Sequence, residues 1–305
     1  MKQLIGVDVG GSSVKLGAVT GAGERLAEVS VAVEAGASAR EILGTVGARA
    51  RELAGGAPRG IGVGLPGLLD REAGTIRNSP NLPWLEGVDV RALLARASGA
   101  ERESILLEND ANVAALGELW LGAARGARHL ILLTLGTGIG GGIVLDGRLY
   151  RGEGLAGEIG HLTVDPDGPP CGCGSHGCLE TLASASATQR RARELGLPAE
   201  APGDLRLLAD RARETDGPER ALLFAVGRDL GHGCGSALCL LDVRTFVFGG
   251  GFSAALDLLE PGIRRGLSEW AYGERVAGVR IERATLGPSA GWIGAARLLV
   301  PVDVL

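Results

Sequence analysis

The stretch LIGVDVGGSSVKLGAVTGAGERLAE, residues 4–28, follows the same plan as LILLTLGTGIGGGIVLDGRLYRG, residues 130–152. In both, an apolar run with strand character leads into a turn of Gly, Ser or Thr, and a second strand-like run ends at a Gly turn. Two hairpins of one design in a single chain indicate an internal duplication. We therefore expect two halves that each open with a β-hairpin.

The segments around these hairpins alternate between helix and strand patterns. Helices are expected at 39–57, from Asp110 to Leu121, over most of 181–230, and in SAGWIGAARLL at 289–299. Buried strands that end in turns are expected in IGVGLPG (61–67) and RTFVFGGGFS (244–253). Strands and helices that alternate within repeated halves predict an α/β architecture with two lobes.

Composition narrows the function classes. The chain has 305 residues, 52 glycines and a net charge of −5. That charge argues against nucleic acid or an anionic membrane as the main partner. The N-terminal MKQLIGVDVGG has no signal-peptide pattern. The longest uncharged apolar run, 130–145, is shorter than the about 20 residues of a membrane span. We expect a cytoplasmic protein.

Two G-x-G-x-x-G matches start at Gly62 and Gly136. A dinucleotide site needs a helix directly after the glycines, because the helix N-terminus holds the pyrophosphate. The sequences that follow, LLDREAGTIRN and GIVLDGRL, have no helical pattern, and no Walker A motif occurs. These glycines therefore do not predict a dinucleotide or P-loop site.

Hairpin turns remain as candidate anion sites. Glycine lets phosphate oxygens approach the backbone N–H groups, and hydroxyls add donors. A single hairpin of this kind is commonly an ordinary turn, but two copies from duplicated halves can hold one polyphosphate. The residues concerned are Gly10, Gly11, Ser12 and Ser13 in the first turn and Gly136, Thr137 and Gly138 in the second. Asp8, just before the first turn, could hold a water of a Mg²⁺ ion.

Three of the five cysteines lie in HLTVDPDGPPCGCGSHGCLE, residues 161–180. The spacing of Cys171, Cys173 and Cys178 is C-x-C-x4-C, so it contains no C-x-x-C redox pair, and a disulfide would leave an odd thiol in a reducing compartment. Tetrahedral zinc fits three thiolates but needs a fourth ligand. His176 would crowd the ligands, and His161 precedes the loop. Cys234 and Cys239 are expected to be buried packing residues.

The chain resembles the ROK group of sugar kinases and repressors, and among its subgroups the bacterial ATP-dependent glucokinases. The resemblance covers essentially the whole sequence. Its motifs stand in family order: DVGGSSVK (8–15), LENDANVAALGE (107–118), TLGTGIGGGIV (134–144), GEIGHLTV (157–164), CGCGSHGCLE (171–180) and VFGGGFS (247–253).

This resemblance implies the actin-like ATPase fold, a duplicated ribonuclease H-like fold whose two lobes flank a cleft. We expect residues 1–118, rejoined by the last helix at 289–305, to form the N-terminal lobe with the first hairpin and the catalytic aspartate. Residues 119–288 would form the C-terminal lobe with the second hairpin, the zinc loop and an adenosine motif.

Asp110 stands at the expected helix start, where an aspartate is commonly an N-cap. The family carries its general base at this position. The resemblance therefore implies that Asp110 accepts the proton of the sugar hydroxyl during phosphoryl transfer. The nearby helix N-terminus would favour the ionised carboxylate.

The resemblance also assigns the binding residues. Hexose contacts fall on Gly67, Asn109, Asp110, Glu158, His161 and Glu180, with Asn81 as a weaker candidate. Besides the two turns, nucleotide contacts fall on Lys15, Gly250 and Gly251. The zinc ligands are His161, Cys171, Cys173 and Cys178. ATP, Mg²⁺ and a structural zinc ion are the expected cofactors.

The leading hypothesis is an ATP-dependent hexokinase that phosphorylates the 6-hydroxyl of glucose. N-acetylglucosamine, N-acetylmannosamine, fructose or mannose could replace glucose, and the donor could be polyphosphate. A regulator of this family carries a DNA-binding domain ahead of the kinase-like part, whereas the first hairpin here begins at Leu4. A noncatalytic sugar sensor is a further alternative. We expect a homodimer or homotetramer.

Two further expectations concern binding. A side chain at Gly138 should weaken nucleotide binding far more than sugar binding, because it would intrude where phosphates need bare backbone. Gly250 and Gly251 should behave as Gly138 does, since the resemblance places them beside the adenosine. Loss of zinc should impair sugar binding much more than ATP binding, since the phosphate hairpins lie outside the cysteine loop.

Overall fold

The computed structural model describes residues 3–77, 79, 82–199 and 204–301. The chain divides into two compact units, each described separately below. The first comprises Met1–Arg128, Gly142–Ala156 and Thr285–Leu305, and the second comprises His129–Gly141 and Gly157–Ala284. The lobe boundaries after residues 118 and 288 stay a prediction.

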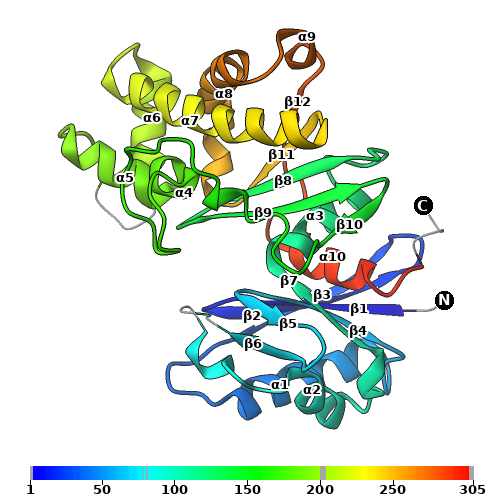
Figure 1. Cartoon of the computed structure of the whole chain (residues 1–305). Helices are drawn as coiled ribbons and strands as arrows, with labels where there is room; N and C mark the ends of the chain where they lie inside the picture. Colours follow the sequence, from blue (N-terminus) through cyan, green and yellow to red (C-terminus); the bar gives the residue numbers. More distant parts are fainter. Residues whose placement is uncertain (1–2, 78, 80–81, 200–203, 302–305) are drawn as a thin grey trace. The chain divides into compact units, whose positions relative to one another are not determined.

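Each half of the chain contributes a five-stranded sheet, and the two sheets have the same topology (Figure 1). The first has the order β3-β2-β1-β4-β7 and the second β10-β9-β8-β11-β12. The strands of the first are β1 (Gln3–Val9), β2 (Ser13–Thr20), β3 (Arg25–Ala32), β4 (Ile61–Leu65) and β7 (Ile105–Asn109). Those of the second are β8 (Leu130–Leu135), β9 (Ile139–Leu145), β10 (Arg148–Tyr150), β11 (Thr245–Gly249) and β12 (Arg280–Arg283). The repeated order confirms the α/β fold class.

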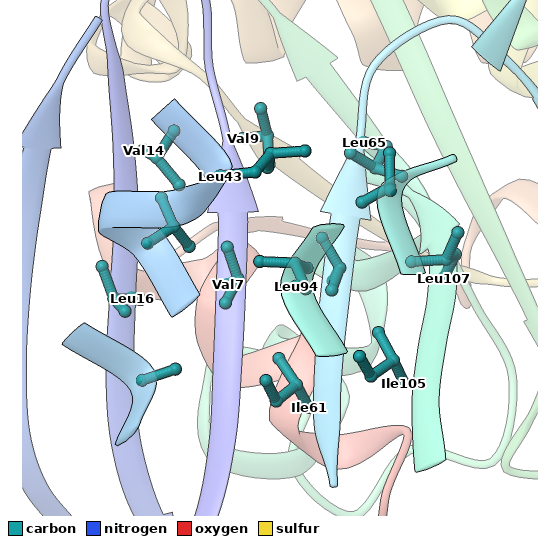
Figure 2. Close-up of a cluster of buried hydrophobic side chains, with 14 of the residues drawn as sticks. Val7, Val9, Val14, Leu16, Leu43, Ile61, Leu65, Leu94, Ile105 and Leu107 are labelled. Atoms are coloured by element: carbon teal, nitrogen blue, oxygen red, sulfur yellow. The ribbon is translucent and has the colours of Figure 1, made fainter. Parts of the chain in front are cut away.

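Helices cover both faces of the first sheet. Figure 1 shows α1 (Ala39–Leu53) and α2 (Val90–Ser98) on one face, and α3 (Asp110–Leu121) and α10 (Ala290–Arg297) on the other. Between the sheet and the first helix pair, valines of β1 and β2 meet Leu43 and Leu94 (Figure 2). Each fully buried side chain of this size contributes about 2 kcal/mol of hydrophobic stabilisation. This core holds the ends of the central strands in place.

Glycines let α10 approach the sheet closely. A side chain at Gly6, or at its ladder partner Gly62, would overlap backbone carbonyl groups of α10. Further along, Gly291 of α10 faces the carboxylate of Asp8, and a side chain there would overlap it. The close approach therefore covers much of the carboxylate of Asp8 and leaves this residue half-buried.

The second unit is rich in helices, of which α7 and α8 pack side by side (Figure 1). They are α4 (Leu179–Ala183), α5 (Ala185–Glu194), α6 (Arg206–Glu214), α7 (Pro218–Leu241), α8 (Leu256–Trp270) and α9 (Gly273–Val276). Within the described part of the chain, no helix is both long enough and apolar enough to cross a membrane.

Short elements complete the fold. They are the β5–β6 hairpin (Leu68–Asp70 and Thr75–Arg77) and the 3-10 helices η1 (Pro83–Leu85), η2 (Arg102–Ser104), η3 (Ile159–His161), η4 (Gly251–Ala255) and η5 (Gly287–Ser289).

The helix predicted from Asp110 to Leu121 has those same bounds. The prediction for Cys234 and Cys239 is half correct. Cys234 is buried, whereas Cys239 is exposed because it lies in the last turn of α7, beside the 81% exposed Leu240.

Candidate active site

Three parallel strands of the first sheet end at one edge and carry polar residues there. The register aligns Asp8 of β1 with Gly64 of β4, and Gly64 with Glu108 of β7. Asn109 ends β7, and Asp110 begins α3. Ligands in α/β sheets bind beyond the carboxyl ends of the strands. Residues from distant parts of the sequence thus gather at the edge where a substrate is expected.

The start of α3 fixes Asn109 and Asp110. Asn109 is the N-cap, and its Oδ1 accepts hydrogen bonds from the backbone N–H groups of Ala111 (2.9 Å) and Asn112 (3.2 Å). Asp110 is the first helical residue, and its Oδ1 accepts from the N–H of Ala111 at 2.8 Å. The alternative in which Asp110 is the N-cap is therefore wrong. The cap occupies Oδ1 of Asn109, so its Nδ2 is the side-chain group that the cap does not use.

Asp8 is a half-buried carboxyl group close to a second acid, Asp110. The pKa of Asp8 is raised to about 7, mainly because burial disfavours the charged form and also because of the negative charge of Asp110, while Lys15 opposes both. Lys15 is the direct cross-strand neighbour of Asp8 in the first hairpin. Two carboxylates with a single lysine as counter-charge suit a divalent cation with oxygen ligands. The residues present therefore fit the expected Mg²⁺, which Asp8 would hold through a water.

Glu108 has a role that the sequence analysis missed. Its side chain is 1% exposed and forms ion pairs with Arg71, which follows β5, and with the Nε of Arg151 at 2.6 Å. Glu108 Oε1 also accepts from the Nδ2 of Asn112 (3.0 Å) and the N–H of Asn109 (2.9 Å). Although burial opposes ionisation, the two arginines hold the pKa of Glu108 below its usual value. The carboxylate of Glu108 thereby connects the start of α3, next to Asp110, with the segment after β5 and the segment after β10.

The first hairpin turn is closed by its own backbone. The N–H of Gly10 bonds with the carbonyl of Ser13 at 3.0 Å, and the turn residues Gly11 and Ser12 are exposed. Gly67 follows β4 at the same edge of the sheet and has a φ of 92°, a backbone conformation that favours glycine. Asn81 lies outside the described residues.

The second unit brings the four predicted zinc ligands together. One ligand atom from each of His161, Cys171, Cys173 and Cys178 lies within 4.8 Å of the others. The Sγ of Cys173 is 3.7 Å from that of Cys178, and the Sγ of Cys171 is 3.6 Å from the Nδ1 of His161. Tetrahedral zinc with ordinary Zn–S and Zn–N bonds would place such atoms about 3.8 and 3.6 Å apart. The separations fit a zinc ion and are too long for a disulfide.

His161 directs its two ring nitrogens to different partners. Nδ1 faces Cys171 in the cluster, and Nε2 lies 3.9 Å from a carboxylate oxygen of Glu158. A ligating histidine commonly has its second nitrogen fixed by a carboxylate or carbonyl. Glu158 and the outer nitrogen of His161 are therefore placed to meet a hydroxyl group together. His176 does not belong to the described cluster.

Glu180 makes a contact that sequence separation did not predict. It lies on α4, whose N-cap is Cys178, and its Oε2 accepts a hydrogen bond from the N–H of Ile139 at 2.8 Å. Ile139 directly follows the turn of the second hairpin. A side chain at Gly138 would overlap the carboxylate of Glu180. The expectation that a side chain at Gly138 weakens nucleotide binding far more than sugar binding stays a prediction, and the contact adds that such a side chain would also displace Glu180.

The two glycines of the adenosine motif differ. Gly250 has a φ of 78°, and a Cβ there would overlap the backbone of Leu135, whereas a Cβ at Gly251 would meet nothing within 4 Å. Gly251 lines a hollow of about 470 Å³ together with Leu205, which directly precedes α6, Ala209 of α6 and Phe252 of η4. The two positions thus differ in backbone conformation and in the space around them, and their expected effect on nucleotide binding stays a prediction.

The comparisons with known proteins agree with this geometry. The ROK family model matches residues 4–301. The glucokinase of Thermotoga maritima is 35% identical over 97% of this chain and 97% of that protein. A ROK hexokinase structure from Thermus thermophilus is 37% identical, covers 99% of both chains and has a TM-score of 0.83. A ROK family glucokinase from Streptomyces griseus, solved with glucose and AMPPNP, is 33% identical, with 97% of this chain and 98% of that chain covered and a TM-score of 0.76.

The duplicated sheets define the protein as an α/β protein of the actin-like ATPase fold. The chain belongs to the ROK family. The resemblance inferred from the motifs is confirmed.

Proposed function

We propose that the protein is an ATP-dependent glucokinase that transfers the γ-phosphoryl group of ATP to the 6-hydroxyl of glucose. The observation that carries this proposal is the position of Asp110 at the carboxyl edge of the first sheet, close enough to Asp8 for its charge to raise the pKa of that residue. The glucokinase relatives and the glucose complex of the Streptomyces griseus protein support the choice of sugar and donor.

In the proposed reaction, Asp110 accepts the proton of the 6-hydroxyl as the new O–P bond forms. The bond between the γ-phosphorus and the bridging oxygen of ATP breaks, and ADP leaves. Such a base contributes about 10² to 10⁴ in rate. Mg²⁺, when bound near Asp8, would neutralise phosphate charge. The turns Gly10–Ser13 and Gly136–Gly138 would bind phosphates through backbone N–H groups, with Lys15 nearby.

The remaining assignments follow the same proposal. Gly67, Asn109, Glu158, His161 and Glu180 would contact the hexose, and Gly250 and Gly251 would lie beside the adenosine. Zinc held by His161 and the three cysteines would be structural, since four protein ligands leave no open position for a water. A cluster of unpaired thiols suits the reducing cytoplasm, where we place the enzyme. We also propose a homodimer or homotetramer.

A coupled phosphorylation assay with a panel of hexoses and with ATP or polyphosphate tests the proposal. Glucose with MgATP should give the highest kcat/KM. Asp110→Asn should lower kcat by at least about 10²-fold while the calorimetric Kd for glucose changes little. Near-normal turnover of that variant would exclude Asp110 as the base, and preference for another hexose would exclude glucose as the substrate.

A further inference from the structure

Helix α4 is joined at both ends to functional segments of the second unit. At its start, Cys178 belongs to the zinc cluster, and the N–H of Leu179 bonds with the carbonyl of Leu162 at 2.8 Å. In its first turn, Glu180 accepts from the N–H of Ile139. Just beyond its end, the N–H of Ala185 bonds with the carbonyl of Gly136 at 2.9 Å. The helix and its exit therefore make hydrogen bonds at both sides of the turn Gly136–Gly138.

We propose that Glu180 is a positioning residue for the second phosphate hairpin as well as a sugar-binding residue. One carboxylate would then join the two substrate subsites of this unit: Oε2 holds the backbone of the hairpin, and Oε1 is available to a sugar hydroxyl. This inference rests on the proposed function for the assignment of the subsites.

The hairpin needs an external partner because of its own composition. The run from Gly136 to Gly142 contains five glycines, and glycine-rich backbone loses the most conformational freedom when it is ordered. A hydrogen bond to an ionised carboxylate is among the stronger ones in proteins. The bond from Ile139 to Glu180 therefore lowers the entropy that phosphate binding would otherwise have to remove.

Gly138 has a second reason to be glycine. A side chain there would displace the carboxylate that holds Ile139, whatever its effect on a phosphate. Gly138 has no positive φ, so alanine fits the backbone, and its Cβ meets the carboxyl group of a side chain that can move. Alanine at this position therefore probes the contact with Glu180 without straining the turn.

The negative charge of Glu180 opposes phosphate binding, because a carboxylate near a phosphate site repels phosphate. The proposal therefore requires that the gain from ordering the hairpin is larger than this repulsion. Glutamine separates the two contributions, because its amide carbonyl can accept the bond from Ile139 without carrying charge. Alanine removes the bond and the charge together.

Calorimetric titration of AMPPNP with Mg²⁺, in the absence of sugar, tests the inference on the zinc-loaded protein. Glu180→Ala should weaken AMPPNP binding about tenfold, as expected for loss of one charge-assisted hydrogen bond. Glu180→Gln should bind AMPPNP at least as tightly as the parent. Glu158→Ala is the matched control: it removes another proposed sugar carboxylate, whose side-chain partner among the described residues is His161 rather than the hairpin, and should leave AMPPNP binding unchanged. Parental affinity in a folded Glu180→Ala would overturn the inference.

Glucose titrations distinguish failure of this inference from failure of the proposed function. If glucose affinity is unchanged in both Glu158→Ala and Glu180→Ala, the proposed sugar site is wrong. If both lose glucose affinity and Glu180→Ala keeps its AMPPNP affinity, only the positioning role is wrong. Gly138→Ala serves as the second variant, in case Glu180→Ala does not fold. It should weaken glucose binding several-fold, and unchanged glucose affinity would contradict the contact.

Discussion

Among single residues, Asp8 sets function against stability. Burial and the charge of Asp110 raise its pKa from 3.8 to about 7. Between these values the folded protein binds more protons than the unfolded chain, so the free energy of unfolding falls as pH rises through this range. The contribution of Asp8 to the free energy of unfolding is fully present below about pH 4 and is lost above about pH 7. The carboxyl group thus destabilises the fold in its ionised form, the form that would serve Mg²⁺.

Asp8→Asn should therefore stabilise the protein at pH 8, by up to about 4 kcal/mol for a pKa difference of about three. Near pH 4 the variant and the parent should unfold alike. Urea unfolding across pH 4 to 8, without added Mg²⁺, measures this, and phosphorylation activity should be lost at every pH. A variant no more stable than the parent at pH 8 would contradict the burial argument.

For single residues, the sequence predicted which side chains lie at the site better than it predicted which residues they contact. Asp8, Asn109 and Asp110 stand next to recognisable strand ends or helix starts, so their position could be inferred. Glu108 gave one signal, a charged residue next to the end of an apolar strand, but its partners Arg71 and Arg151 come from separate segments. The bond between Glu180 and Ile139 had no sequence signal, because only the fold brings α4 against the hairpin.

Among the elements, the turn from β11 into η4 shows how adjacent glycines differ. Gly250 combines a positive φ with a backbone contact to Leu135, whereas Gly251 has open space around it. The sequence GGG predicts a turn at this point, but not which glycine the turn requires. The φ values and the distance to β8 decide that.

Gly250→Ala should destabilise the protein by about 2 kcal/mol or more, because backbone strain and overlap add. Gly251→Ala should leave the midpoint of thermal unfolding nearly unchanged and raise the KM for ATP, since its methyl group would enter the hollow proposed for adenosine. Calorimetric melting and steady-state kinetics of both variants measure this. If Gly251→Ala changes neither KM nor stability, the adenosine does not lie against this residue.

For the whole molecule, the duplication was predictable because each half repeats the same pattern of hairpin, helix and buried strand. The strand orders β3-β2-β1-β4-β7 and β10-β9-β8-β11-β12 confirm it. Individual side-chain contacts between segments far apart in the sequence were not predictable. Glu118 of α3, for example, is fully buried and accepts from the N–H of Leu286 at 2.9 Å, where the chain re-enters the first unit. Such contacts depend on how distant segments pack, which local patterns do not contain.

Removal of zinc tests whether the cysteine loop, α4 and the second hairpin depend on one another. The loop DPDGPPCGCGSHG, residues 165–177, has little apolar content to order itself, and zinc binding supplies on the order of 10 kcal/mol in small modules. Cys178 leads directly into α4, which bonds with the second hairpin. The sequence alone predicted that loss of zinc impairs sugar binding much more than ATP binding. The hydrogen bonds of α4 give a structural reason for the smaller effect that we expect on ATP binding.

Cys171→Ser should lower bound zinc from one per chain, raise the KM for glucose by tenfold or more, and raise the KM for ATP by a smaller but measurable factor. The larger effect falls on glucose because His161 and Glu158 lie in or beside the cluster itself, whereas the hairpin is reached only through α4. Cys239→Ser is the matched control, since this exposed thiol lies outside the cluster and should retain zinc and both KM values. Metal content is measured by atomic spectroscopy on variants that melt cooperatively. Full glucose affinity in a folded, zinc-free variant would show that the cysteines do not serve the sugar site, and an unchanged KM for ATP would show that α4 does not transmit the loss to the hairpin.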